Sequence, residues 1–205
     1  MSRKAGGMFI AVEGIDAVGK RTQSSALSSW LASKKLSVST LSFPDYGTVL
    51  GREIKRFLVG EKDYPQQVRA MLYAANRWER KSDLEATIAR CDATVVNRYT
   101  GSNLAYGTSN GLDLDWLVNL EVGLPTPDLT LVLDAPATHL KPRRGMNKDT
   151  YERNLELQER TRGAYLQLSK KFGWRVVDAT KGIDETGALL KAAVSEAFAA
   201  SGRTV

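Results

Sequence analysis

A glycine–lysine motif between an apolar run and a helical segment constrains this chain more than any other feature. Residues 14–20 read Gly-Ile-Asp-Ala-Val-Gly-Lys; they follow the apolar run 8–12 and precede residues 23–36, where Leu27 and Leu31 fall at helical spacing. Glycines allow such a turn to take positive φ and allow its backbone to approach a ligand closely. Backbone N–H groups, the helix N-terminus and the lysine ammonium then form a cradle for phosphate. The motif predicts a phosphate-binding loop whose ligand is a nucleoside triphosphate.

One position of this loop departs from the usual pattern. The expected triphosphate-binding residues are Gly14, Ile15, Asp16, Ala17, Val18, Gly19, Lys20, Arg21 and Thr22. After the lysine, where such loops usually carry Ser or Thr for Mg²⁺, this chain has Arg21. Thr22 lies about 100° further round the helix, so we do not expect it to substitute. Metal binding must therefore rely on other groups, of which Asp16 is the main candidate.

Length and composition narrow the class of protein. With 205 residues the chain can build one substantial core, and we expect a single domain. The net charge of +6 is spread over short basic pairs without a basic, aromatic-rich stripe, so we expect nucleotide phosphates and no nucleic acid as partners. The single cysteine, Cys91, excludes an intrachain disulfide and fits a cytoplasmic location. We expect no export signal and no membrane partner, because the early apolar run is short.

Five apolar, β-branched runs predict the fold. They alternate with helical patterns long enough to cross over a sheet, and they span residues 8–12, 38–43, 93–96, 129–133 and 175–177. This alternation predicts an α/β fold with a doubly wound, five-stranded parallel sheet flanked by helices. Ligands of such sheets bind beyond the carboxyl ends of the strands, where this chain places polar residues. These are 13–20, 44–46, 97–99, Asp134 and Asp178.

The segments between the runs predict helices and one irregular stretch. Residues 66–90 fit one long helix with Met71, Leu72, Ala75 and Trp78 on its apolar face. Further helices are expected at 113–124, 151–172 and 184–200. Residues 140–150 are polar and basic and contain a proline and a glycine, which indicates a mobile segment.

Several further motifs occur in a specific order after the phosphate loop. They are Phe-Pro-Asp-Tyr at 43–46, Tyr-Ala-Ala-Asn-Arg-Trp-Glu at 73–79, Asn-Arg-Tyr at 97–99 and Tyr-Glu-Arg at 151–153. In order and spacing, residues 8 to about 200 resemble the thymidylate kinase family. The resemblance implies the P-loop nucleoside-monophosphate kinase fold with a short lid, a cytoplasmic homodimer, and transfer of the ATP γ-phosphoryl group to dTMP with Mg²⁺, giving dTDP and ADP for dTTP synthesis. It divides the domain into strand and phosphate loop (8–22), acceptor-nucleotide region (43–110) and lid (140–153).

Charged residues are the candidates for the chemistry. Phosphoryl transfer between two polyanions requires charge neutralisation and in-line positioning, so arginines should converge from several segments. The resemblance assigns Arg98 to the acceptor phosphate, and Asp16 to the dTMP 3′-hydroxyl and the vicinity of Mg²⁺. The candidate catalytic residues are Lys20, Asp16, Arg98 and the lid arginines Arg143, Arg144 and Arg153. Which lid arginine reaches the transferred group stays open, and a solvated arginine is the alternative for each.

The expected dTMP-binding residues are Asp16, Phe43, Tyr46, Tyr73, Arg77, Arg98, Asn103 and Tyr106. Tyr73 and Arg77 lie four residues apart on one helix face, and the resemblance has them stack on thymine and donate to its O4. Asn103 meets the base edge and Tyr106 packs where a ribose 2′-hydroxyl would project. Core packing is the alternative for the first pair, and helix capping or core packing is the alternative for Asn103 and Tyr106. Tyr46 stands where many relatives carry arginine, and its hydroxyl can donate to the acceptor phosphate.

A second departure from the family pattern concerns the metal. The residue before Arg98 is Asn97 instead of the family's aspartate, and a neutral amide is a poorer partner for Mg²⁺. We therefore expect retained activity that is slow or sensitive to metal. Two alternatives stay open: a kinase for another pyrimidine monophosphate or a deoxynucleoside, and a catalytically weakened nucleotide-binding protein.

Overall fold

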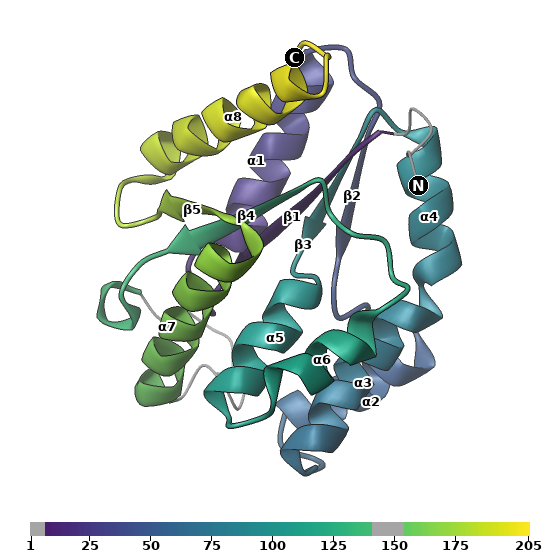
Figure 1. Ribbon diagram of the computed structural model, residues 1–205, viewed down its shortest axis with the longest axis vertical. Coiled ribbons are helices and arrows are strands. Elements are labelled where there is room, and N and C mark those ends of the chain that lie inside the picture. Colours follow the sequence, from purple (N-terminus) through teal and green to yellow (C-terminus); the bar gives the residue numbers. More distant parts are fainter. Residues whose placement is uncertain (1–6, 141–153) are drawn as a thin grey trace.

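The fold is built around one parallel sheet that is flanked by helices (Figure 1). The computed structural model describes residues 7–140 and 154–205 of the chain. The strands are β1 (Met8–Gly14), β2 (Val38–Ser42), β3 (Ala93–Asn97), β4 (Leu129–Asp134) and β5 (Arg175–Asp178). Their order is β2-β3-β1-β4-β5, and every neighbouring pair is parallel. The predicted five-stranded parallel α/β fold is confirmed, and all five apolar runs form its strands.

Helices cover both faces of the sheet and its carboxyl-terminal edge. One face carries α1 (Lys20–Ser33) and α8 (Ile183–Ala200); the other carries α4 (Lys81–Arg90), α5 (Thr100–Ser109) and α7 (Leu155–Phe172). Beyond the carboxyl ends of β2 and β3 lie α2 (Val49–Leu58), α3 (Gln66–Glu79) and α6 (Leu114–Glu121), at the bottom of Figure 1. A short 3₁₀ turn, η1 (Ala137–His139), follows β4.

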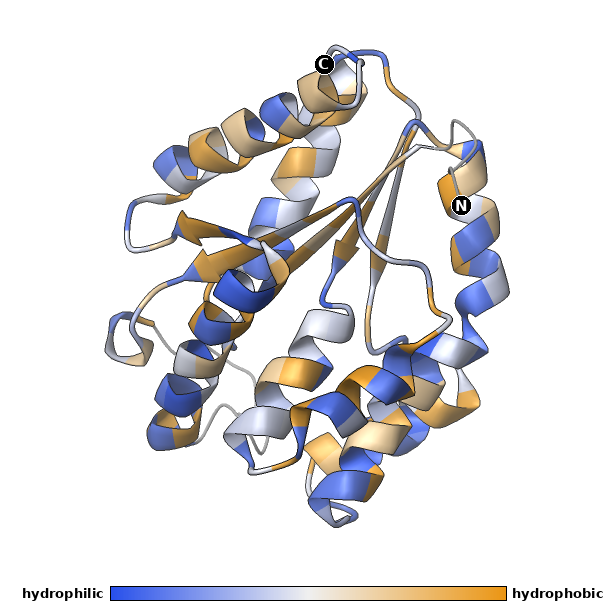
Figure 2. Ribbon diagram, viewed as in Figure 1, coloured by the Kyte–Doolittle hydropathy of each residue, from blue (hydrophilic) through white to orange (hydrophobic). Residues whose placement is uncertain are grey.

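The core explains why the strand sequences are continuously apolar. Every residue of β1 is buried. Ile10 packs in one cluster with Leu27 and Leu31 of α1, whereas Phe9 packs in another with Leu84 of α4. Because both faces of a parallel sheet are covered by helices, its strands need apolar residues at successive positions. Figure 2 shows this as predominantly hydrophobic central strands beneath helices whose hydrophilic residues alternate with hydrophobic ones.

The predicted single helix over residues 66–90 is wrong, because Arg80 separates α3 from α4. The guanidinium of Arg80 pairs with Asp45 at 3.1 Å and with Asp83 at 2.8 Å. A straight helix of this length would run about 37 Å. The two halves instead pack in different places: α4 inserts Leu84 and Ile88 against the sheet, whereas α3 lies beyond the strand ends.

The apolar face expected on α3 is only partly covered, since Leu72 and Ala75 are half-buried. Met71 and Trp78 are 44% and 40% exposed, and the buried positions are Ala70, Ala74, Asn76 and Arg77. The helix therefore turns Met71 and Trp78 outward and the charged Arg77 inward.

Two other helix boundaries differ from the expectation. The helix expected at 113–124 is shorter, since Asp113 caps it by accepting from the N–H of Trp116 at 2.8 Å. The helix expected from 151 begins at Leu155, after the cap Asn154. Residues 141–153, and with them most of the expected lid, lie outside the described residues. Within the described ranges, no helix is both long and apolar enough to cross a membrane.

Candidate active site

The turn between β1 and α1 has the backbone conformation of a phosphate loop. Gly14 has φ of 134°, and a Cβ there would lie 2.5 Å from the carbonyl oxygen of Leu133, so a side chain would clash. Gly19 caps α1 with φ of 96°. Lys20 is buried, and its Nζ donates to the carbonyl oxygen of Ile15 at 2.6 Å. The lysine ammonium is therefore held within the loop whose N–H groups can bind phosphate.

Glu13 ties the start of this loop to helix α5. Its fully buried carboxylate accepts from the backbone N–H of Tyr99 at 2.7 Å and of Ser102 at 3.1 Å. The hydroxyls of Ser102 and Tyr165 donate to it at 2.6 and 2.9 Å. A carboxylate at a helix N-terminus satisfies orphan N–H groups and complements the helix dipole. Glu13 thus fixes the position of α5, and of the residue before it, relative to the phosphate loop.

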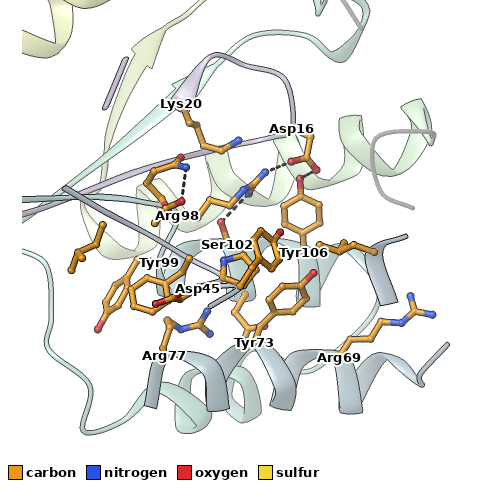
Figure 3. A pocket seen from close by; sticks show the side chains of 18 of the residues that line it. Asp16, Lys20, Asp45, Arg69, Tyr73, Arg77, Arg98, Tyr99, Ser102 and Tyr106 are labelled. Carbon is orange, nitrogen blue, oxygen red and sulfur yellow. Dashed lines mark hydrogen bonds and ion pairs between the residues drawn. The ribbon is translucent and has the colours of Figure 1, made fainter. Parts of the chain in front are cut away.

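Arg98 lies between β3 and α5, facing the phosphate loop. Its backbone has φ of 62°, a conformation uncommon for a residue with a side chain, and its N–H donates to the carbonyl of Val12 at 2.9 Å. The guanidinium pairs with Asp16 and donates to the hydroxyl of Ser102 at 3.0 Å. Figure 3 shows Arg98 reaching across toward Asp16, with Lys20 on the adjacent side. Backbone strain at one well-supported position is typical of functional sites.

The charges around Asp16 keep it ionised. Burial by itself raises the pKa of Asp16, but the positive charges of Arg98 and Lys20 and hydrogen bonds from Tyr106 and Gln158 outweigh burial and lower the pKa to about 2. The hydroxyl of Tyr106 donates to Asp16 Oδ2 at 2.6 Å, and burial together with the negative charge of Asp16 raises the pKa of Tyr106. Asp16 is therefore a carboxylate at neutral pH, and Tyr106 is a neutral donor.

Gln158 joins the helix after the expected lid to the phosphate loop. It accepts from the backbone N–H of Asp16 at 3.0 Å and donates to Asp16 Oδ2 at 3.1 Å. The same helix carries Arg162, which makes a two-pronged pair with Asp134 at 2.7 and 3.0 Å and also pairs with Glu159. Arg162 is thus held by carboxylates from β4 and from its own helix.

A cavity of about 760 Å³ opens beside the phosphate loop, between the ends of β2 and β3 and helices α3 and α5. Its volume suits a small-molecule ligand. Every residue expected to bind the acceptor lies in its wall: Asp16, Phe43, Tyr46, Tyr73, Arg77, Arg98, Asn103 and Tyr106. Lys20 and Arg21 of the loop also line it, whereas Gly14, Ile15, Ala17, Val18, Gly19 and Thr22 do not. Arg143, Arg144 and Arg153 lie outside the described residues.

The α3 side of the cavity is rich in side chains that can recognise a ligand. Figure 3 shows Arg69, Tyr73 and Arg77 rising from one helix, opposite Tyr106. Arg77 is buried because it pairs with Glu121, a contact that the sequence did not indicate. The expected juxtaposition of Tyr73 and Arg77 in one pocket is therefore found.

Asn76 supports the opposite wall of the cavity. It is fully buried, accepts from the N–H of Asp45 at 2.8 Å and donates to the hydroxyl of Thr48 at 2.9 Å. These bonds hold the turn that carries Tyr46, whose side chain is 44% exposed at the rim. Phe43, in contrast, is buried in the core beneath the cavity.

The described residues do not form a protein-built Mg²⁺ site. The carboxylate of Asp16 is already engaged by Arg98, Tyr106 and Gln158, and both oxygens of Asp134 accept from Arg162. Over residues 7–140 and 154–205, no three His, Cys, Asp or Glu side chains converge as a metal site. Mg²⁺ commonly binds proteins through few carboxylates and through substrate phosphates, so a Mg²⁺ ion at this site would take ligands from a bound phosphate.

An Asn97→Asp variant should therefore need less Mg²⁺. Asn97 Nδ2 donates to Ser42 Oγ at 2.9 Å, while its Oδ1 is buried without a partner among the described residues. A carboxylate would accept from the same hydroxyl and add a negative charge at the cavity wall. We expect the Mg²⁺ concentration that gives the half-maximal rate to fall about three- to tenfold, because one hydrogen-bonding group contributes about that much to binding.

The measurement is the initial rate of nucleoside-diphosphate formation across a Mg²⁺ titration. The control is Asn119→Asp, the same substitution at an exposed position of α6. An Asn97→Asp enzyme with the rate and Mg²⁺ dependence of the wild type would show that Asn97 does not limit metal support.

The supporting residues of this site were not predicted. Glu13, Asn76, Glu121 and Gln158 each fix a residue or turn at the cavity, but none belongs to a spacing pattern that marks such a role. Gln158 contacts a residue 142 positions away in the sequence. Two of them carried a signal: Glu13 is an acid directly before the glycine motif, and Asn76 lies inside the motif at 73–79.

The parallel sheet, the phosphate loop at its central strand and the adjoining cavity define a P-loop kinase that acts on nucleotides. The family model of thymidylate kinase matches residues 12–189. The chain belongs to the thymidylate kinase family.

Individual relatives agree with this assignment. The chain is 32% identical to a thymidylate kinase of Dictyostelium discoideum over 180 residues, covering 87% of this chain and 81% of the relative. It is 33% identical to a thymidylate kinase of Homo sapiens over 181 residues, covering 87% and 85% of the two chains. Among solved structures, the thymidylate kinase of Candida albicans, described as revealing the origin of broad substrate specificity, matches with a TM-score of 0.81, 28% identity and coverage of 95% and 93%.

Proposed function

We propose that this chain transfers the γ-phosphoryl group of ATP to dTMP, giving dTDP and ADP for dTTP synthesis. The single observation that carries the proposal is the convergence of the phosphate loop, Arg98 and the α3–α5 side chains on one cavity. The thymidylate kinase relatives across distant organisms support the same reaction.

The proposed division of roles follows from charge. The loop N–H groups and Lys20 bind the phosphates of ATP, and Arg98 binds the phosphate of dTMP close to the transferred group. Asp16 is the acceptor for the 3′-hydroxyl, since its pKa of about 2 keeps it ionised. The lid arginines Arg143, Arg144 and Arg153 are proposed to cover the phosphates.

The sugar and base have their own proposed contacts. Tyr106 lies against the sugar, so that a 2′-hydroxyl would be crowded and the deoxynucleotide preferred. Tyr73 stacks on the base, and Arg77 and Asn103 read its edge. Tyr46, at the rim, donates to the acceptor phosphate.

The proposed enzyme is a cytoplasmic homodimer that uses ATP together with Mg²⁺. When bound, Mg²⁺ neutralises charge on the ATP phosphates. The dimer is supported by exposed apolar residues of α3 and of the end of α6: Met71, Trp78 and Val122 are 44%, 40% and 64% exposed. Cys91 is a free cysteine, which supports a location in a reducing compartment.

An acceptor panel tests the proposal. We expect dTMP to give the highest kcat/KM, and dUMP to be lower by about 10- to 100-fold because a methyl group in an apolar pocket is worth that much. UMP should be weaker again, dGMP should fit badly, and thymidine should not react because it lacks the phosphate that Arg98 binds. Diphosphate formation from ATP and Mg²⁺ is measured for each acceptor, with Lys20→Ala as the blank.

Other outcomes would identify the alternatives. A different preferred acceptor would make the chain a kinase for that nucleotide, and the broad specificity stated for the Candida albicans relative is the reason to include several bases. Binding of ATP and dTMP without turnover of any acceptor would identify a nucleotide-binding protein instead of an enzyme.

A further inference from the structure

Glu121, the last residue of α6, joins three helices at the base-recognising side of the cavity. Its carboxylate accepts from Nε of Arg77 at 2.9 Å and from the neighbouring Nη2, and from Nδ2 of Asn103 at 2.7 Å. The side chains of Arg77 and Glu121 are only 3% and 8% exposed. Arg77 and Asn103 line the cavity, whereas Glu121 does not. Glu121 therefore acts on a ligand only through these two neighbours.

The contacts of Asn103 fix which of its atoms a ligand can meet. Its Nδ2 donates to the carbonyl oxygen of Ala70 at 3.2 Å as well as to Glu121. A backbone carbonyl and a carboxylate can only accept, so both amide protons must point at them. The polar atom of Asn103 that remains for a ligand is Oδ1, an acceptor.

Arg77 supplies the complementary group. Glu121 engages Nε and one proton of Nη2, and the guanidinium keeps further N–H donors on Nη1 and Nη2. The recognition surface thus consists of one acceptor, Asn103 Oδ1, and donors from Arg77. That pattern matches a pyrimidine imide, which presents N3–H and a C4 carbonyl.

We propose that Glu121 is the positioning residue that makes the pocket select imide bases, thymine and uracil, over cytosine. The inference rests on the proposed function and deepens it. Cytosine presents an unprotonated N3 and an N4 amino group, so its N3 would face the Asn103 carbonyl and its N4 donors would face the Arg77 donors. Two mismatched polar groups in a buried pocket disfavour binding strongly.

The substitution that tests this is Glu121→Gln, which keeps size and shape. A glutamine amide can donate to Asn103 Oδ1, which leaves only the carbonyl of Ala70, at 3.2 Å, to hold the amino group of Asn103 inward. Asn103 then turns more readily and presents its amino group, the partner that cytosine N3 requires. We expect the ratio of kcat/KM for dTMP to that for dCMP to fall about three- to tenfold, the effect of one hydrogen bond of ordinary strength. The change should lie mainly in KM, because Glu121 is remote from the phosphates.

Two companion variants separate charge from position. Asp115→Asn removes one negative charge from an exposed position of the same helix and should leave the ratio unchanged. Glu121→Asp retains an acceptor-only carboxylate and should keep the preference for dTMP even where affinity falls. A Glu121→Gln enzyme that melts at a lower temperature but discriminates between dTMP and dCMP like the wild type would reduce Glu121 to a structural ion pair and overturn the proposal.

A measurement on the wild-type protein avoids any folding defect of the variants. The side-chain amide protons of Asn103, assigned by NMR through their loss in Asn103→Ser, should exchange slowly with solvent both before and after dTMP is added. Fast exchange, or an amide that donates to the nucleotide, would contradict the proposed orientation. If the wild type does not phosphorylate dTMP at all, the proposed function fails, while the exchange rates still decide the orientation of Asn103.

Discussion

A Lys20→Ala variant is expected to lose kcat for dTMP phosphorylation by about 10²- to 10³-fold, the usual effect of removing one preorganised group from a charged transition state. The Lys20 ammonium is buried inside the phosphate loop and anchored on the carbonyl of Ile15 at 2.6 Å. It is thus fixed before the nucleotide arrives, and no other side chain of the loop except Arg21 carries a positive charge.

The measurement for Lys20 is single-turnover formation of dTDP at saturating ATP, with the melting temperature recorded beside it. The control is Lys34→Ala, which removes an exposed lysine at the other end of the same helix. A Lys20→Ala enzyme with the kcat of the wild type would mean that this loop does not hold the phosphates of the donor.

An Arg98→Ala variant is expected to lose kcat/KM for dTMP by about 10³-fold. This loss lies within the range known for arginines that neutralise a transferred phosphoryl group. Arg98 is held in place from several sides: its N–H bonds to Val12, its guanidinium bonds to Ser102, and Glu13 fixes the start of the next helix. Its charge also helps to keep the pKa of Asp16 near 2, so the variant should raise that pKa.

Arg98→Lys distinguishes charge from geometry. A lysine keeps the positive charge but lacks the planar fork, so we expect activity between those of the alanine variant and the wild type. Arg175→Ala is the matched control, since Arg175 is 57% exposed and pairs only with an exposed glutamate in the described contacts. Equal activity of Arg98→Ala and Arg175→Ala would remove Arg98 from the proposed mechanism.

The strands and the phosphate loop could be predicted because both leave local patterns. A strand buried on both faces needs a continuous apolar run, and all five runs proved to be strands. The break at Arg80 left no such pattern: the surrounding residues Glu79, Arg80 and Lys81 are all compatible with a helix, and only the packing of the two halves separates them.

The outward face of α3 shows the same limit. Met71 and Trp78 have the apolar character of core residues, and periodicity cannot tell whether the surface that covers them belongs to the same chain or to a second one. Inside, the helix places Arg77, which is buried because Glu121 from a distant segment compensates its charge.

The residues that line the cavity were largely predictable, but those that hold them were not. Arg98, Asp16 and Tyr106 belong to motifs with a chemical reason for their spacing, and they meet as expected. Glu121 and Gln158 are single residues whose partners are fixed only by the tertiary structure. The orientation of the recognition groups therefore had to come from the fold.

The most direct measurement is a ³¹P NMR spectrum of the wild-type protein incubated with ATP, Mg²⁺ and dTMP. We expect ADP and dTDP to appear in equal amounts while ATP and dTMP are consumed, and both to form about 10²- to 10³-fold more slowly when Lys20→Ala replaces the wild type. Consumption of ATP to ADP and inorganic phosphate with dTMP unchanged, or no reaction although both nucleotides bind, would contradict the proposed function.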